Sequence, residues 1–122
     1  MQNQFLVSWH IPGTLTANIT ITFTMPCLAT LKHVQAVGSN ANDATLAVGT
    51  SADADGYVTA FAIGDSGTPV EKEDKTDFAG ALAANQFPAI ADGTIVVFTL
   101  DYDGSAGTAA ANVTITATFQ AE

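Results

Sequence analysis

Residues 93–122 read GTIVVFTLDYDGSAGTAAANVTITATFQAE, and two alternating runs within this stretch decide the fold. The first run places four apolar residues on one face of an extended chain: Val96, Phe98, Leu100 and Tyr102. The second run alternates polar residues with Val113, Ile115, Ala117 and Phe119. A period of two is typical of a strand with one buried face. Because DGSAG at 103–107 has a turn composition, the stretch predicts a β-hairpin with one apolar face.

The same alternation predicts further strands upstream, over residues 4–10, 17–24, 30–37, 44–48 and 57–63. ANITIT at 17–22 nearly repeats ANVTIT at 111–116. We interpret this as two strands that each face water on one side, with internal duplication as the alternative. The charged stretch 70–78 predicts a solvated edge strand or an exposed loop. Residues 79–85 have the composition of a short helical turn.

Seven or eight short strands, with turn signals every ~8–12 residues, indicate an all-β fold. We predict one domain over residues 1–122, an antiparallel β-sandwich with a jelly roll as the first choice. A chain of this size buries roughly two thirds of the surface that it exposes when unfolded, so it needs no disulfide. Cys27 is the only cysteine, and we expect it to be a small buried apolar side chain.

The charge balance narrows the choice of partners. The chain has 12 acidic residues, 3 lysines and no arginine, which gives a formal net charge of -9. Phosphate binding needs lysine or arginine, so we expect neither nucleic acid nor an anionic membrane as a partner. The first ten residues have no basic residue before a short apolar part, unlike a signal peptide. We therefore expect synthesis in a cytoplasm.

Three groupings resemble catalytic motifs, and we interpret none as catalytic. His33, Asp43 and Ser66 follow the His, Asp, Ser order of chymotrypsin-like proteases, but Thr68 stands where their motif has glycine. That family also needs two barrels, which exceed this chain. Cys27 with His33 lacks an orienting group, and His10 with His33 lacks a third metal ligand. We expect no enzymatic activity and no catalytic residues.

Two loops share the spacing Asp-x-Asp-Gly, and their four carboxylates are calcium candidates: Asp53, Asp55, Asp101 and Asp103. Calcium takes six to eight oxygen ligands, so two carboxylates per loop are too few unless the loops meet. We expect ordinary turns and no cofactor. Trp9, Tyr57 and Tyr102 would offer a carbohydrate platform if they were exposed together, although aromatic residues on such strands belong more often to the core.

An interface is predicted where apolar residues fall on faces that should be wet. The strand over 57–63 is apolar on both parities, and Ile95 and Val97 lie on the polar face of their run. Exposed apolar area of this kind marks interaction sites. The interface candidates are Tyr57, Val58, Ala60, Ala62, Ile95 and Val97. Residues 2–9 either complete the domain's own sheet or add to the sheet of another protein, and we favour the first.

Over residues ~28–120 the chain resembles the capsid decoration, or cement, proteins of tailed bacteriophages. The segments that carry this resemblance are LKHVQAV at 31–37, ATLAVGT at 44–50, FAIGDS at 61–66, DGTIVV at 92–97 and DYDG at 101–104, with the run to Phe119. The resemblance implies a small β-sandwich without enzymatic activity, often a trimer, that binds the major capsid protein outside a finished shell. It assigns no functional residues. The alternative is a carbohydrate-binding or adhesive module of a head fibre or tail.

Overall fold

A computed structural model describes residues 3–121. Its strands, in chain order, are β1 (Asn3–Thr14), β2 (Ile19–Thr24), β3 (Ala29–Val37), β4 (Thr45–Gly49), β5 (Val58–Ala62), β6 (Val70–Lys72), the two-residue β7 (Ala89–Ile90), β8 (Ile95–Asp101) and β9 (Ala111–Ala121). The only helical element of the described chain is one 3-10 turn, η1 (Lys75–Asp77). The prediction of an all-β chain is confirmed.

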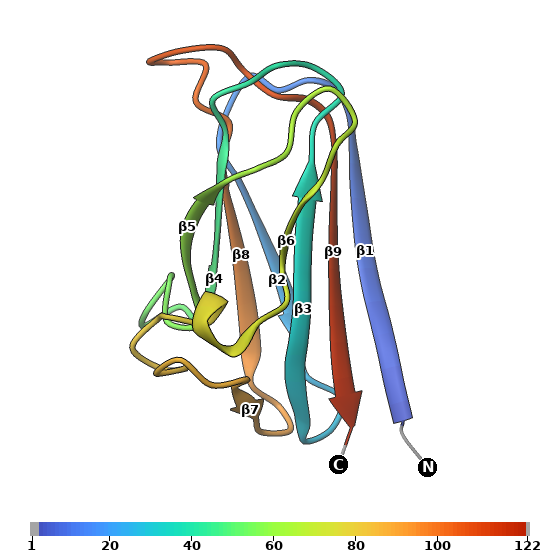
Figure 1. The fold of residues 1–122 in the computed structure, drawn as a ribbon, viewed down its shortest axis with the longest axis vertical. Helices are drawn as coiled ribbons and strands as arrows, with labels where there is room; N and C mark the ends of the chain where they lie inside the picture. The colour runs from blue at the N-terminus through green and yellow to red at the C-terminus, as the bar shows by residue number, and fades with distance from the viewer. Residues whose placement is uncertain (1–2, 122) are drawn as a thin grey trace.

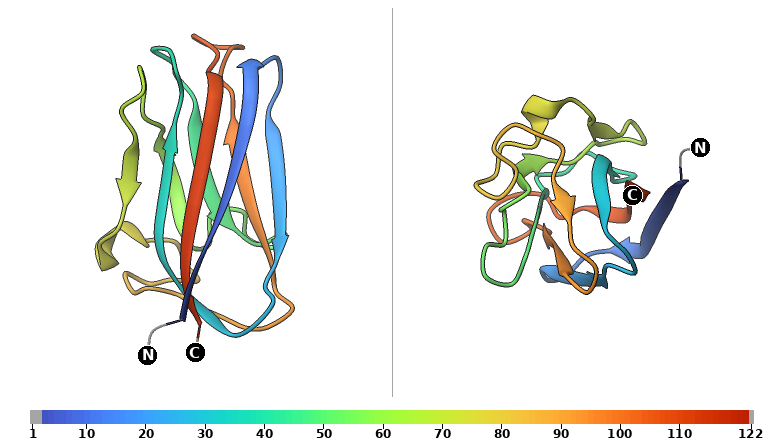
Figure 2. Two further views of the ribbon diagram at one scale, coloured as in Figure 1. Left: turned by 90° about the vertical axis from the view of Figure 1, so that its right-hand side faces the viewer. Right: turned by 90° about the horizontal axis from the view of Figure 1, so that it is seen from below.

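The strands form two sheets that pack face to face (Figures 1 and 2). One sheet has the order β1-β9-β3-β6, with β7 also paired to β3, and the other has the order β2-β8-β4-β5. Neighbouring strands within both sheets are antiparallel. The described chain is therefore an antiparallel two-sheet sandwich, as the alternating pattern predicts.

The alternation assigns the inner faces correctly because side chains of a strand point to opposite sides of its sheet. On β9 the side chains of Val113, Ile115, Ala117 and Phe119 are fully buried between the sheets. On β8 the inner side chains are Val96, Phe98 and Leu100, which are also fully buried. The threonines that alternate with them face outward on β9.

The predicted C-terminal hairpin is wrong. β8 pairs with β2 and β4, whereas β9 pairs with β1 and β3, so the two runs belong to different sheets. Residues 102–110 cross from one sheet to the other, and Asp43 holds this crossing by accepting a 2.7 Å hydrogen bond from Thr108 N–H. Apolar parity shows which face of a strand is buried. It does not distinguish two strands paired in one sheet from two strands facing each other across a core.

The predicted edge strand over residues 70–78 is confirmed in part, since β6 lies at one end of its sheet and η1 follows it. The Asp77 carboxylate accepts hydrogen bonds from the backbone N–H groups of Asp74 and Glu73, and these bonds lower its pKa. The short helical turn predicted over residues 79–85 is confirmed in part, because Ala83 and Ala84 N–H both donate to the Gly80 carbonyl. It ends after one turn, since Ala84 and Asn85 adopt left-handed φ angles of 54° and 61°, which right-handed helix excludes.

The N-terminal segment completes the domain's own sheet, as we favoured, from Asn3 onward, while Gln2 lies outside the described residues. Strand β1 pairs with β9 along its length, from Asn3 opposite Ala121 to Thr14 opposite Ala111. The two ends of the described chain therefore lie side by side (Figure 1). Cys27 packs against the core but is only half-buried, because it lies in the turn between β2 and β3.

Replacing Phe98 or Phe119 with alanine should lower the free energy of unfolding by roughly 3–5 kcal/mol, because each ring is fully buried and its loss leaves a cavity. Chemical denaturation monitored by circular dichroism measures the change. Leu28→Ala, in an exposed turn position, is the matched control and should cost under about 1 kcal/mol. Equal small effects at all three positions would contradict the burial assignment.

Candidate functional site

The two sheets are left open along one edge of the sandwich. β1 and β2 are the end strands of their sheets on the same side, and each pairs on one side only within residues 3–121 (Figure 2). Their inward side chains are only half-buried, unlike those of β8 and β9. We call this set the open edge: Phe5, Val7, Trp9 and Ile11 of β1, with Ile19, Ile21 and Phe23 of β2.

Aromatic rings bridge the sheets beneath the open edge. Within one sheet Phe5 stacks on Phe119 of the neighbouring strand, with ring centroids 5.2 Å apart, whereas Trp9 reaches Phe98 of the other sheet, with ring centroids 4.9 Å apart. Phe23, from the other sheet, contacts both β1 rings, at 6.5 Å from Phe5 and 6.3 Å from Trp9. The rings of the open edge therefore have one side on the core and the other side toward solvent.

The opposite edge, between β5 and β6, is closed by the chain itself. Lys72 places its Nζ 5.1 Å from the centroid of the Phe61 ring, which covers that ring. The segment that follows β6 adds the fully buried Phe78 and the buried Ala83 and Ile90. One edge of the sandwich is thus covered by a loop, whereas within residues 3–121 the other has no such cover.

Charged residues are also absent from the strands of the open edge. Residues 1–31 and 104–121 contain no Asp, Glu, Lys or Arg, so β1, β2 and β9 carry none of these residues. Edge strands usually carry charges that prevent pairing with other chains. Our sequence analysis missed the open edge, and this uncharged stretch of 31 residues is the signal that could have found it.

The outer faces beside the open edge are polar but neutral. On the β1–β9 face, Ser8 and Thr116 hydroxyls lie 3.3 Å apart, and His10 Nδ1 lies 2.9 Å from the Thr114 hydroxyl. Leu6 projects from this face with 61% of its surface exposed. The β1–β9 face therefore offers hydroxyls, the His10 imidazole and one leucine, and it carries no Asp, Glu, Lys or Arg.

Three of the six predicted interface residues are exposed: Ala60, Ala62 and Ile95, the last with 51% of its surface accessible. Tyr57, Val58 and Val97 are buried and offer little area. A register shift between β4 and β5 turns Val58 inward beside Val48. Burial also raises the pKa of Tyr57. Val97 points outward as predicted, but it lies beside Gly49, against which the loop 50–56 folds back.

The two Asp-x-Asp-Gly loops lie at opposite ends of β4. Thr45 pairs with Asp101 at one end of the strand, and the loop carrying Asp53 and Asp55 follows Gly49 at the other. The four residue steps from Thr45 to Gly49 separate these ends by roughly 14 Å, so the four carboxylates do not meet. Within the second loop, Asp101 accepts a 3.0 Å hydrogen bond from Asp103 N–H, as a turn-forming aspartate does.

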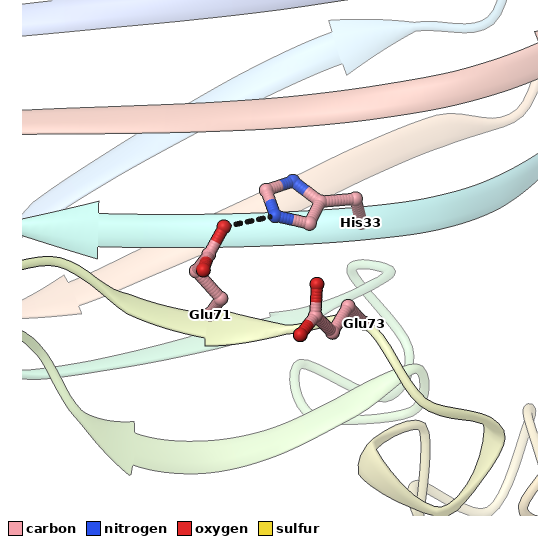
Figure 3. Close-up of side chains that lie close together, drawn as sticks. All are labelled: His33, Glu71 and Glu73. Carbon is pink, nitrogen blue, oxygen red and sulfur yellow. Dashed lines mark hydrogen bonds and ion pairs between the residues drawn. The ribbon is translucent and has the colours of Figure 1, made fainter.

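His33, Glu71 and Glu73 form a cluster on the outer surface (Figure 3). His33 Nε2 lies 2.9 Å from a Glu71 carboxylate oxygen, and ligand atoms of all three residues lie within 4.8 Å of one another. A register shift beside His33 in β3 accompanies this arrangement. Imidazole and carboxylates suit zinc chemically, but both glutamates are exposed, and such groups gather on surfaces without metal. We assign the cluster no function.

The residues of the catalytic-like groupings are engaged separately. His33 contacts Glu71, Asp43 accepts from Thr108, and Ser66 N–H donates to Asn40 beyond the end of β3. His10 and His33 pair with Thr114 and Thr118, roughly 14 Å apart along β9. Trp9 lies at the open edge, whereas Tyr57 adjoins β5 on the far side, so the aromatic residues form no common platform. No pocket is present among residues 3–121.

No protein-family model matches this sequence, no curated protein matches it significantly, and no solved structure matches the fold significantly. Within the described chain, no helix has the length and apolar character needed to cross a lipid bilayer.

The Asp53–Asp55 pair makes stability depend on pH. A side-chain hydrogen bond to Asp55, desolvation and the negative charge of Asp55 together raise the pKa of Asp53 above its usual 3.8. Protonated Asp53 therefore stabilises the folded state. This contribution to stability is fully present below the pKa of Asp53 in the unfolded chain and is lost as pH rises through its pKa in the folded chain. We expect Asp53→Asn to raise the melting temperature at pH 7, because the amide can donate to Asp55 at every pH, and to have no stabilising effect at pH 3.

Thermal melting at both pH values measures this difference. Asp65→Asn is the matched control, since it removes one negative charge outside the pair. If both variants gave the same change of melting temperature at each pH, net charge rather than the Asp53–Asp55 contact would explain the effect.

Proposed function

We propose that this protein is a non-enzymatic virion structural protein that decorates and stabilises the outside of a bacteriophage capsid. The observation that carries the proposal is a β-sandwich that has no pocket among residues 3–121 and that offers its edges and outer faces for contact. The resemblance of residues ~28–120 to decoration proteins supplies the partner, the major capsid protein, and the trimeric state.

The strand pairing supports a jelly roll. With the two-residue β7 left out, the first strand pairs with the last (β1 with β9) and the second with the next to last (β2 with β8). The third pairs with the sixth (β3 with β6), and the fourth with the fifth (β4 with β5). A long antiparallel hairpin rolled into two sheets gives this pairing, which is the arrangement of an eight-stranded jelly roll.

A decoration protein acts by binding the assembled shell and not the dispersed subunits. Binding to one state stabilises that state, by about 2.7 kcal/mol per site when the free protein is at 100 times its dissociation constant. Many weak sites on one shell therefore add up to a large increase in resistance to rupture. This role needs a rigid, self-contained domain with external contact surfaces and no reactive group.

The test uses heads of a phage that encodes the chain, prepared without this protein. Adding the purified protein should raise the temperature at which heads release DNA, with a dose dependence that saturates when the sites are filled. Imaging of the restored heads should place the protein outside the capsid, in contact with the major capsid protein.

Phe119→Ala protein, destabilised in its core, is the control and should restore resistance poorly at elevated temperature. Heads that never bind the purified protein would refute the proposal. Imaging that places the protein on the tail would instead support the adhesive module.

A further inference from the structure

We infer that the open edge, formed by β1 and β2, is the surface through which copies of this chain associate. The trimeric state is taken from the proposed function, whereas the choice of surface rests on strand pairing, burial and charge. In a ring of three copies the open edge would point toward the three-fold axis, where the half-buried rings of Phe5, Trp9 and Phe23 would lose their remaining contact with water.

The outer side of β1 can form backbone hydrogen bonds with a strand of another chain. β1 is 12 residues long, and its outer side has no strand neighbour within residues 3–121. It carries no Asp, Glu, Lys or Arg, and its only proline, Pro12, stands close to its end. A long edge without charges or a central proline lacks the devices that keep sheet edges apart in monomers. The opposite edge has such charges on β6, together with a covering loop.

The distribution of acidic residues favours a second copy of this chain as the partner that binds the open edge. Each chain has a formal net charge of -9, so two copies repel each other wherever their acidic residues meet. In the described chain all of these charges lie within residues 32–103, so none lies on β1 or β2, although Asp92 and Asp101 adjoin the two ends of β2. The open edge is thus a surface on which two copies can meet without bringing carboxylates together. A basic partner would gain no attraction there and would be drawn to the acidic part instead.

The size of the open edge fits a stable contact. The 12 residues of β1 span about 40 Å but the six residues of β2 only about 20 Å, and two sheets about 10 Å apart give, with their side chains, a width of about 20 Å. A mean length of about 30 Å then gives about 600 Å² on each copy, or about 1,200 Å² in total, which is the lower end of the range for specific interfaces. Crystal-packing contacts mostly bury less than about 800 Å² in total, so this area suits a specific contact between two copies.

Trp9 makes the inference directly testable, because it is the only tryptophan of the chain and belongs to the open edge. The purified protein, without capsids, is diluted from high to low concentration while light scattering gives its mass and fluorescence gives the Trp9 emission. We expect the mass to fall to that of a monomer and the emission to shift to longer wavelength with the same midpoint. A monomer at every concentration, or a fall in mass without a shift of emission, would overturn the inference.

Charged substitutions separate the open edge from other surfaces. Val7→Lys places a charge among the half-buried side chains, and we expect it to raise the midpoint concentration of dissociation at least about tenfold. Leu6→Lys places the charge on the exposed face of the same edge strand, where folding tolerates it. We expect it also to raise the midpoint concentration, and it replaces Val7→Lys in the test if that variant does not fold. Leu82→Lys, which is similarly exposed but lies beside the loop 50–56, is the control and should leave the midpoint unchanged.

An equal effect of all three substitutions would refute the assignment of the surface. A dimer that dissociates with the Trp9 shift would support the open edge as the interface and contradict the trimer. Because no capsid is present, failure here leaves the binding of heads untouched, and failure of head binding leaves this result untouched.

Discussion

Aromatic rings that cross from one sheet to the other hold this sandwich together. Phe23 of β2 stacks on Phe119 of β9, with centroids 5.8 Å apart, and Trp9 of β1 contacts Phe98 of β8 in the reverse direction. Such pairs add about 0.5–1.5 kcal/mol each to the stabilisation from burial. β9 lies between β1 and β3, so these contacts fix the position of both neighbours.

The sequence predicts the strands and their inner faces well, because alternation reports directly on which side chains avoid water. It predicts the pairing of strands poorly. Val96 to Leu100 and Val113 to Phe119 have the parity of a hairpin, yet their inner faces meet across the core from two sheets. The burial of Val97 likewise depends on a loop that folds back beside Gly49, which no local pattern shows.

The open edge was visible in the sequence only as an absence of charge, which by itself has several explanations. The structure places this uncharged segment at one edge of the sandwich, because residues 1–31 contain β1 and β2, the end strands of the two sheets on the same side. At the opposite edge the chain itself covers the apolar side chains between the sheets, since Phe78 and Ile90 belong to a long segment that folds over this edge. Covering an edge with one's own chain favours a monomer, whereas leaving it bare favours an assembly.

The pairing of Asn3 with Ala121 places the two ends of the described chain at one pole of the sandwich, with the crossing 102–110 at the other (Figure 1). A cargo domain fused to either end would therefore emerge from the same pole, and a short linker could join the ends to give a circular permutant. The opposite pole, where Asp43 holds the crossing, would remain free in both designs. As a scaffold, the molecule thus has one pole for attachment and one pole for presentation.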